Sequence, residues 1–126
     1  MTNGTHLNEF LLESRESISH ISEKLIRFEK EYSSNQNLIN SIYRSVHNLK
    51  GASSFLELKN LENLAHITET VLGYYREGTL KPSEKMIHLL LICFERYLEI
   101  LKIIELTGDE PEGTNQDLIE RLESLL

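Results

Sequence analysis

The chain is poor in several residue types, and each shortage argues against a particular structural feature or class of protein. Its 126 residues include one cysteine, two prolines and no tryptophan. The single cysteine, Cys93, permits no intrachain disulfide and gives no sign of an oxidising compartment. No apolar run approaches the roughly 18 residues of a membrane-spanning helix, and no signal region opens the chain. We therefore expect one soluble, cytoplasmic domain, with Cys93 buried in its core.

Basic residues are also scarce relative to acidic ones. Thirteen lysines and arginines stand against 20 aspartates and glutamates, which gives a formal net charge of −7. Nucleic acids attract basic surfaces, so this balance argues against a nucleic-acid partner. It does not exclude a phosphate on a single residue, because that needs only local positive charge.

Apolar residues recur with the 3.6-residue period of helices, and there is little of the alternation that strands show. Gly78, Gly108 and both prolines fall between the periodic segments. The pattern predicts an all-α fold, namely an antiparallel four-helix bundle with a short fifth C-terminal helix. The helices are expected over residues 7–31, 37–55, 59–76, 83–106 and 115–125, with a turn over residues 33–37. The apolar stripe of the first helix consists of Phe10, Leu11, Ile18, Ile21, Leu25 and Phe28.

One histidine has neighbours that indicate chemistry. His47 is followed by Lys50 and Gly51, at spacings that place all three on one helical face. The apolar residues of this helix gather on its other side, so His47 should point away from the core. Glycine inside a helix costs about 1 kcal/mol relative to alanine, which suggests that a partner needs bare backbone there. We predict that His47 carries a phosphoryl group and that Lys50 offsets its charge.

The next helix offers a carboxylate for this histidine. His66 and Glu69 are three residues apart on its polar side, and an antiparallel pairing of the two helices would bring them near His47. A histidine attacks phosphorus through one ring nitrogen, while the other carries the proton. A carboxylate that accepts a hydrogen bond from that proton fixes the tautomer and favours the positive charge that develops on the ring. Glu69 is the candidate for this role.

Two other functions fit parts of the pattern. His47, His66 and Glu69 could bind a metal, but di-iron bundles use Glu-x-x-His pairs on two helices, whereas one His-x-x-Glu pair stands alone here, beside a lysine that repels cations. A non-catalytic helical interaction module is the second alternative. Each residue taken singly has an ordinary surface explanation, and only the joint pattern on two helices favours phosphoryl transfer.

The stretch HNLKGASSFLEL, residues 47–58, resembles the phosphorylation motif of histidine phosphotransfer (HPt) domains. It is most similar to the N-terminal phosphotransfer domain of CheA-type chemotaxis histidine kinases. FLLES with Glu16, IYRSV, LAHITE and YREG are similar to further segments of that family. The final stretch, residues 108–125, looks like the fifth helix of the kinase version, so the resemblance covers nearly the whole chain.

The resemblance implies roles and partners. His47 would be the phosphoacceptor, and Lys50, His66 and Glu69 would form the hydrogen-bonding and charge network around it. Arg44, Gly51 and Ser54, on the same face, would meet the partner proteins. A separate ATP-binding kinase domain would phosphorylate His47, and a CheY-type response regulator would take the group on an aspartate. The chain would need no cofactor or metal of its own, since magnesium and ATP belong to those partners.

Two positions depart from the family pattern. Ser54 and Glu57 stand where the family commonly has glycine, and both lie at the end of the second expected helix. Nothing in the chain resembles an ATP-binding motif or a dimerisation domain. The chain therefore looks like a domain of a longer kinase or like a free-standing carrier.

Overall fold

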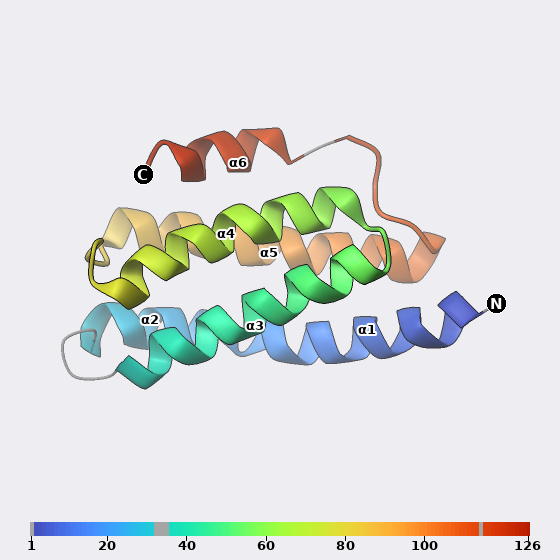
Figure 1. Cartoon of the computed structure of the whole chain (residues 1–126), viewed down its shortest axis with the longest axis horizontal. Coiled ribbons are helices and arrows are strands. Elements are labelled where there is room, and N and C mark those ends of the chain that lie inside the picture. The colour runs from blue at the N-terminus through green and yellow to red at the C-terminus, as the bar shows by residue number, and fades with distance from the viewer. Residues whose placement is uncertain (1, 32–35, 114) are drawn as a thin grey trace.

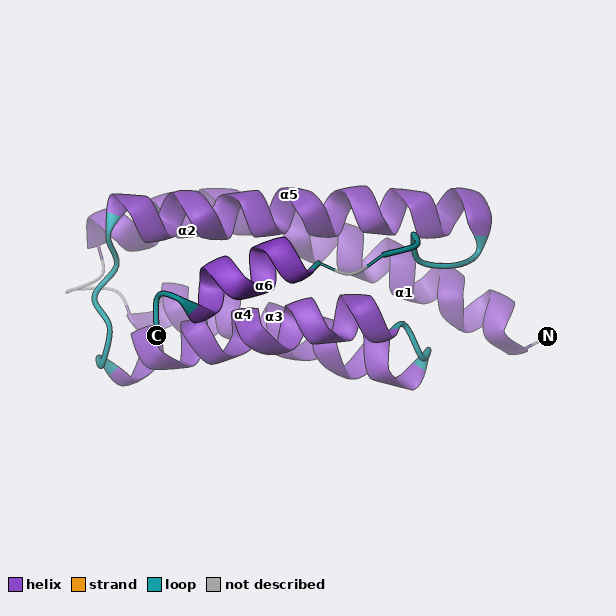
Figure 2. Cartoon of the chain, turned by 90° about the horizontal axis from the view of Figure 1, so that it is seen from above, coloured by secondary structure: helices purple, strands orange, loops and turns teal. Residues whose placement is uncertain are grey.

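Six helices account for most of the chain in the computed structural model, which describes residues 2–31, 36–113 and 115–126 (Figure 1). They are α1 (Thr2–Ser19), α2 (Ile21–Glu31), α3 (Gln36–Phe55), α4 (Lys59–Glu77), α5 (Glu84–Thr107) and α6 (Gln116–Glu123). No strand occurs among the described residues, and loops and turns connect the helices (Figure 2). Residues 33–35 of the expected turn lie outside the described residues, and 36–37 already belong to α3.

The bundle has four helical positions, and α1 and α2 together fill one of them. Both pack against α3 and α5, while α3 pairs with α4 along its length (Figure 1). Neighbouring positions run antiparallel, which confirms the expected fold class. None of the helices in the described ranges combines the length and apolar character that a membrane crossing requires.

The expectation of one unbroken helix over residues 7–31 is wrong at His20. The chain makes a turn there and divides into α1 and α2. Just before the break, the Ser19 hydroxyl donates a hydrogen bond of 2.8 Å to the Glu16 carbonyl oxygen. Serine side chains that bond to nearby backbone compete with the helical ladder, which offers a local reason for the break.

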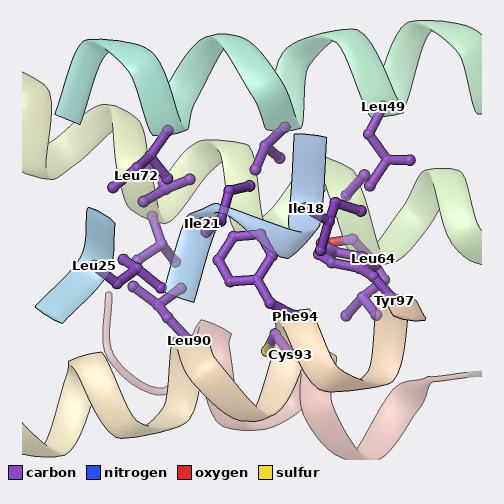
Figure 3. Close-up of a cluster of buried hydrophobic side chains, with 14 of the residues drawn as sticks. Ile18, Ile21, Leu25, Leu49, Leu64, Leu72, Leu90, Cys93, Phe94 and Tyr97 are labelled. Carbon is purple, nitrogen blue, oxygen red and sulfur yellow. The ribbon is translucent and has the colours of Figure 1, made fainter. Parts of the chain in front are cut away.

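The core is almost entirely apolar and is confirmed in detail. All six residues of the expected first stripe are buried. Cys93 is buried too, in the same cluster as Ile18, Ile21 and Leu25 (Figure 3), and this burial raises the pKa of its thiol to about 12. The buried hydroxyl of Tyr97 has hydrogen-bond partners inside the bundle. The Tyr97 hydroxyl lies 2.6 Å from the Thr68 hydroxyl and 3.1 Å from the Leu64 carbonyl oxygen. Buried polar atoms are costly unless they are paired, so this contact joins α5 to α4 without penalty.

The segment that follows α5 is fastened to the beginning of α4. The first backbone N–H groups of a helix have no partner within the helix, and Leu58, the residue before α4, supplies no side-chain cap. The Glu110 carboxylate takes this place, accepting hydrogen bonds from the backbone N–H of Asn60 (3.1 Å) and Leu61 (3.0 Å). The Asn60 side chain donates in return to the Gly113 carbonyl oxygen, at 2.7 Å. A negative charge at a helix N-terminus is also favoured by the helix dipole.

The turn between α3 and α4 contains an unusual backbone conformation. Glu57 has φ = 60°, in the left-handed region that glycine adopts most easily. The N–H of Glu57 bonds to the Ser54 carbonyl (3.1 Å), and that of Leu58 bonds to the Ser53 carbonyl (2.9 Å). These two bonds are those of the Schellman motif, which ends a helix with a left-handed residue. The departure from glycine noted at this position is therefore a source of backbone strain.

We predict that Glu57→Gly raises the free energy of unfolding by about 1 kcal/mol, because glycine removes the cost of the left-handed conformation. Glu57→Ala is the matched control, since it removes the charge but keeps the strain, and it should remain close to wild type. Urea unfolding followed by circular dichroism gives both values. Equal stabilisation by both substitutions would assign the cost to the charge of Glu57 instead.

Candidate functional site

His47 lies on the outer side of α3 and faces α4 across the seam between the two helices. Its side chain is 59% exposed, yet its Nδ1 atom lies 2.6 Å from Oε2 of Glu69 on α4. Glu69 is only 13% exposed. The antiparallel pairing of α3 and α4 thus brings together the two residues that the sequence pattern singled out.

Glu69 also holds Lys50, one turn after His47 on α3. The Lys50 Nζ atom donates a hydrogen bond of 2.8 Å to the second oxygen, Oε1, and the lysine is 25% exposed. Both carboxylate oxygens of Glu69 are therefore bonded to α3. An ammonium group has three donors, of which this contact uses one, so Lys50 retains donors for a further anionic group.

The ionisation of Glu69 determines which nitrogen of His47 carries the proton. Partial burial works to raise the pKa of Glu69, but the hydrogen bonds from Lys50 and His47 outweigh it, so this pKa lies below its ordinary value. An ionised carboxylate can only accept hydrogen bonds. Nδ1 of His47 must then be the protonated donor, which leaves the lone pair of a neutral ring on Nε2.

The other expected site residues share this face but make fewer contacts. The His66 side chain is exposed on α4, one turn before Glu69, and among the described residues none hydrogen-bonds to its ring. Its place in the network therefore stays a prediction. Arg44, Gly51 and Ser54 are all exposed on α3. An added Cβ at Gly51 would meet no atom within 4 Å, so the domain itself does not require glycine at this position.

Two further residues at the site had no role in the sequence interpretation. The ring of Tyr43, one turn before His47, lies parallel to the imidazole within 9°, with 6.2 Å between the ring centroids. The guanidinium carbon of Arg76, in the last turn of α4, lies 4.0 Å from the centre of the Tyr43 ring. The spacing of Tyr43 from His47 puts the two residues on the same face, but no role for the tyrosine was predicted from it. Arg76 lies in the YREG segment of the family resemblance, but its contact with Tyr43 could not be predicted, since that contact depends on how α4 packs.

Metal binding has little support in this geometry. The described ranges contain no cluster of three or more histidine, cysteine, aspartate or glutamate side chains that could hold a metal ion. The neighbour of His47 and Glu69 is instead the ammonium group of Lys50, which repels cations. The arrangement suits a histidine that attacks an electrophile and then carries a negatively charged group.

We predict that Glu69→Gln lowers the free energy of unfolding by about 1 kcal/mol at pH 7, because a neutral amide replaces a carboxylate that accepts charge-assisted hydrogen bonds. The folded protein lowers the pKa of Glu69, so protons bind the unfolded chain first as the pH falls. The stability that Glu69 contributes is thus present above the unfolded-state pKa, near pH 4.5, and is lost as the pH falls through the lower folded-state pKa. The difference between the two proteins, measured by urea unfolding, should shrink below pH 4.5. A difference independent of pH would contradict the ionised contact.

Comparison with known proteins agrees with this geometry. The sequence model of the Hpt domain family matches residues 6–103. The chain is 30% identical over 114 residues to the sensor histidine kinase CheAY of Helicobacter pylori, and 30% identical over 104 residues to the chemotaxis protein CheA of Bacillus subtilis. These alignments cover 90% and 82% of this chain but only 14% and 15% of the two relatives. The chain therefore spans a small part of the length of the proteins it matches.

A solved structure shares the whole fold. The phosphorylated P1 domain of CheA3, in complex with CheY6 from R. sphaeroides, superposes with a TM-score of 0.83 at 19% identity. The match covers 96% of this chain and 94% of that one. The helical bundle of this protein is thus the fold of a P1 domain. With a family model that matches most of its length, the chain belongs to the Hpt domain family.

Proposed function

We propose that this domain is a phosphoryl carrier of a chemotaxis-type two-component system. His47 accepts the group from the ATP-binding domain of a histidine kinase, in the same polypeptide or another, and passes it to an aspartate of a CheY-type response regulator. The observation that carries the proposal is the hydrogen bond of 2.6 Å between Nδ1 of His47 and Glu69, which leaves Nε2 as the nucleophile. Membership in the Hpt family and the similarity to CheA proteins support the same function.

The first step forms one bond and breaks one. The lone pair of Nε2 attacks the γ-phosphorus of ATP, the bond from that phosphorus to the bridging oxygen breaks, and its electron pair leaves with ADP. The imidazole becomes positively charged as the nitrogen–phosphorus bond forms. Glu69, bonded to Nδ1–H, stabilises this charge while the proton stays on Nδ1. The same hydrogen bond holds the Nδ1 atom in place during the attack.

The second step reverses the roles at Nε2. An aspartate oxygen of the response regulator attacks the phosphorus, the nitrogen–phosphorus bond breaks, and its electron pair returns to Nε2. The ring is again neutral with its proton on Nδ1. Lys50, whose ammonium group has donors free beyond Glu69, offsets the charge of the phosphoryl group between the two steps. His66, one turn from Glu69 on α4, belongs to the same network in this proposal.

The domain leaves the remaining chemistry to its partners. Magnesium and ATP are held by the partner domains, and the carrier itself needs no cofactor. We propose the cytoplasm as its location, because the kinase reaction consumes ATP there. Arg44, Gly51 and Ser54 are exposed beside His47 and form the face that both partners approach.

We predict that His47→Gln abolishes labelling by a cognate kinase domain supplied with radioactive ATP and magnesium, because the amide of glutamine is not a nucleophile. His88→Gln is the matched control, since His88 is an exposed histidine on α5, and it should label like wild type. The labelled wild-type domain should lose its phosphate rapidly only when a receiver domain and magnesium are added. Acid-labile phosphate on His47→Gln would refute the assignment.

We predict that Gly51→Ala separates stability from function. An alanine there meets no neighbour, so it should raise the free energy of unfolding by about 1 kcal/mol through helix propensity. It should nevertheless slow phosphoryl transfer, because the methyl group lies in the face that the partners approach. Asn48→Ala is the control, since Asn48 is exposed on the part of α3 that faces α1. Transfer at the wild-type rate in Gly51→Ala would show that no partner contacts this backbone.

A further inference from the structure

The hydrogen bond to Glu69 fixes only one atom of the His47 ring. The imidazole is 59% exposed, so the direction of its plane needs a second restraint. A ring that turns about the Nδ1 contact also swings Nε2 and its lone pair. Phosphoryl transfer requires this lone pair to lie in line with the bond that breaks, so the direction of the plane bears directly on reactivity.

The ring of Tyr43 lies parallel to the imidazole and restrains the direction of its plane. The two rings are parallel within 9°, and the separation of 6.2 Å between centroids is within the range of offset aromatic pairs. Tyr43 is half-buried, and its own position is constrained from α4. There, an added Cβ at Gly73 would lie 3.7 Å from Cε2 of the tyrosine ring. This is an ordinary van der Waals distance, so the tyrosine ring lies close to the backbone of α4 at Gly73.

Arg76 holds the same tyrosine through its charge. Its guanidinium carbon is 4.0 Å from the centre of the Tyr43 ring, well within the range of a cation–π interaction. The arginine is exposed, and its backbone carbonyl accepts a hydrogen bond of 3.0 Å from the Gln36 side chain at the beginning of α3. The end of α4 is thus bonded to α3 close to the tyrosine. Arg76, Tyr43 and His47 form a chain of contacts that runs from α4 to the nucleophile.

We propose that Tyr43 is a positioning residue for His47, and that Arg76 acts through Tyr43. This inference rests on the proposed function, and it names residues that set the reactivity of that same site. Glu69 fixes the edge of the imidazole and Tyr43 fixes its plane. Together they orient the Nε2 lone pair toward an incoming phosphorus atom before either partner binds.

The test uses four variants of the domain and a separate kinase domain supplied with ATP and magnesium. Tyr43→Leu removes the ring but keeps an apolar side chain, whereas Tyr43→Phe keeps the ring and removes only the hydroxyl. Arg76→Gln removes the cation. Tyr74→Leu is the control, because Tyr74 is 37% exposed on α4 and points to a different side of the helix from Arg76. Thermal unfolding of each variant is measured first, and if Tyr43→Leu does not fold, Arg76→Gln carries the test.

The expected result is a change in kcat rather than in KM for phosphorylation of the domain. Tyr43→Leu should lower kcat by about threefold to tenfold, which corresponds to the loss of one aromatic pair. Arg76→Gln should have a smaller effect in the same direction. Tyr43→Phe should restore the wild-type kcat, and Tyr74→Leu should match wild type. In NMR spectra, the His47 ring protons should move in Tyr43→Leu but not in Tyr43→Phe, because they lose the ring current of the neighbour.

Three outcomes would overturn the inference. Tyr43→Leu, or Arg76→Gln in its place, could label with the wild-type kcat. The change could fall on KM alone, which would make Tyr43 a docking residue. Alternatively, Tyr43→Phe could be as slow as Tyr43→Leu, which would transfer the role to the hydroxyl. Failure of the proposed function itself would look different. In that case His47→Gln would still become phosphorylated, or the wild-type domain would not be labelled at all.

Discussion

The carboxylate of Glu69 is the point on which the site depends. A carboxyl group that is only 13% exposed is costly to ionise unless it has charged or hydrogen-bonding partners. Both partners, His47 and Lys50, come from α3, where they are one turn apart. The two helices must therefore align in one register for the carboxylate to reach both donors. The same pairing that satisfies Glu69 leaves the lone pair of the neutral His47 ring on the opposite nitrogen, so packing and reactivity share one cause.

Much of the fold can be predicted from the spacing of apolar residues, and what this spacing fails to predict also has a physical reason. The six stripe residues from Phe10 to Phe28 are buried, as the 3.6-residue period requires. The break at His20 stays hidden in the pattern because Ile18 and Ile21 on its two sides keep the spacing of one continuous helix. A divided helix and an unbroken one can bury the same stripe, so periodicity cannot distinguish them. Similarly, the left-handed conformation of Glu57 could not be read from its residue type, since glycine is the usual occupant.

In the site, too, contacts between residues close in the sequence could be predicted, whereas contacts that depend on the packing of the helices could not. His47 and Lys50 share a face because they are three residues apart, and the pairing of α3 with α4 was enough to bring Glu69 to them. The contact of Arg76 with Tyr43 has no such local basis, because it depends on how the last turn of α4 crosses the first half of α3. The roles of Arg44, Ser54 and His66 rest on the family resemblance. Their positions on the exposed face are compatible with those roles, which remain predictions.

The cap that Glu110 places on α4 makes the segment after α5 part of the framework of the site. The Hpt family match ends at residue 103, before this cap, yet the start of α4 relies on a carboxylate beyond that point. That start directly follows the strained turn at Glu57, which closes the helix of the phosphoacceptor candidate. Residues beyond the family match therefore help to hold the junction of α3 and α4. The segment after α5 thus belongs to the support of the helix pair that carries His47 and Glu69, although it contributes no residue to the site itself.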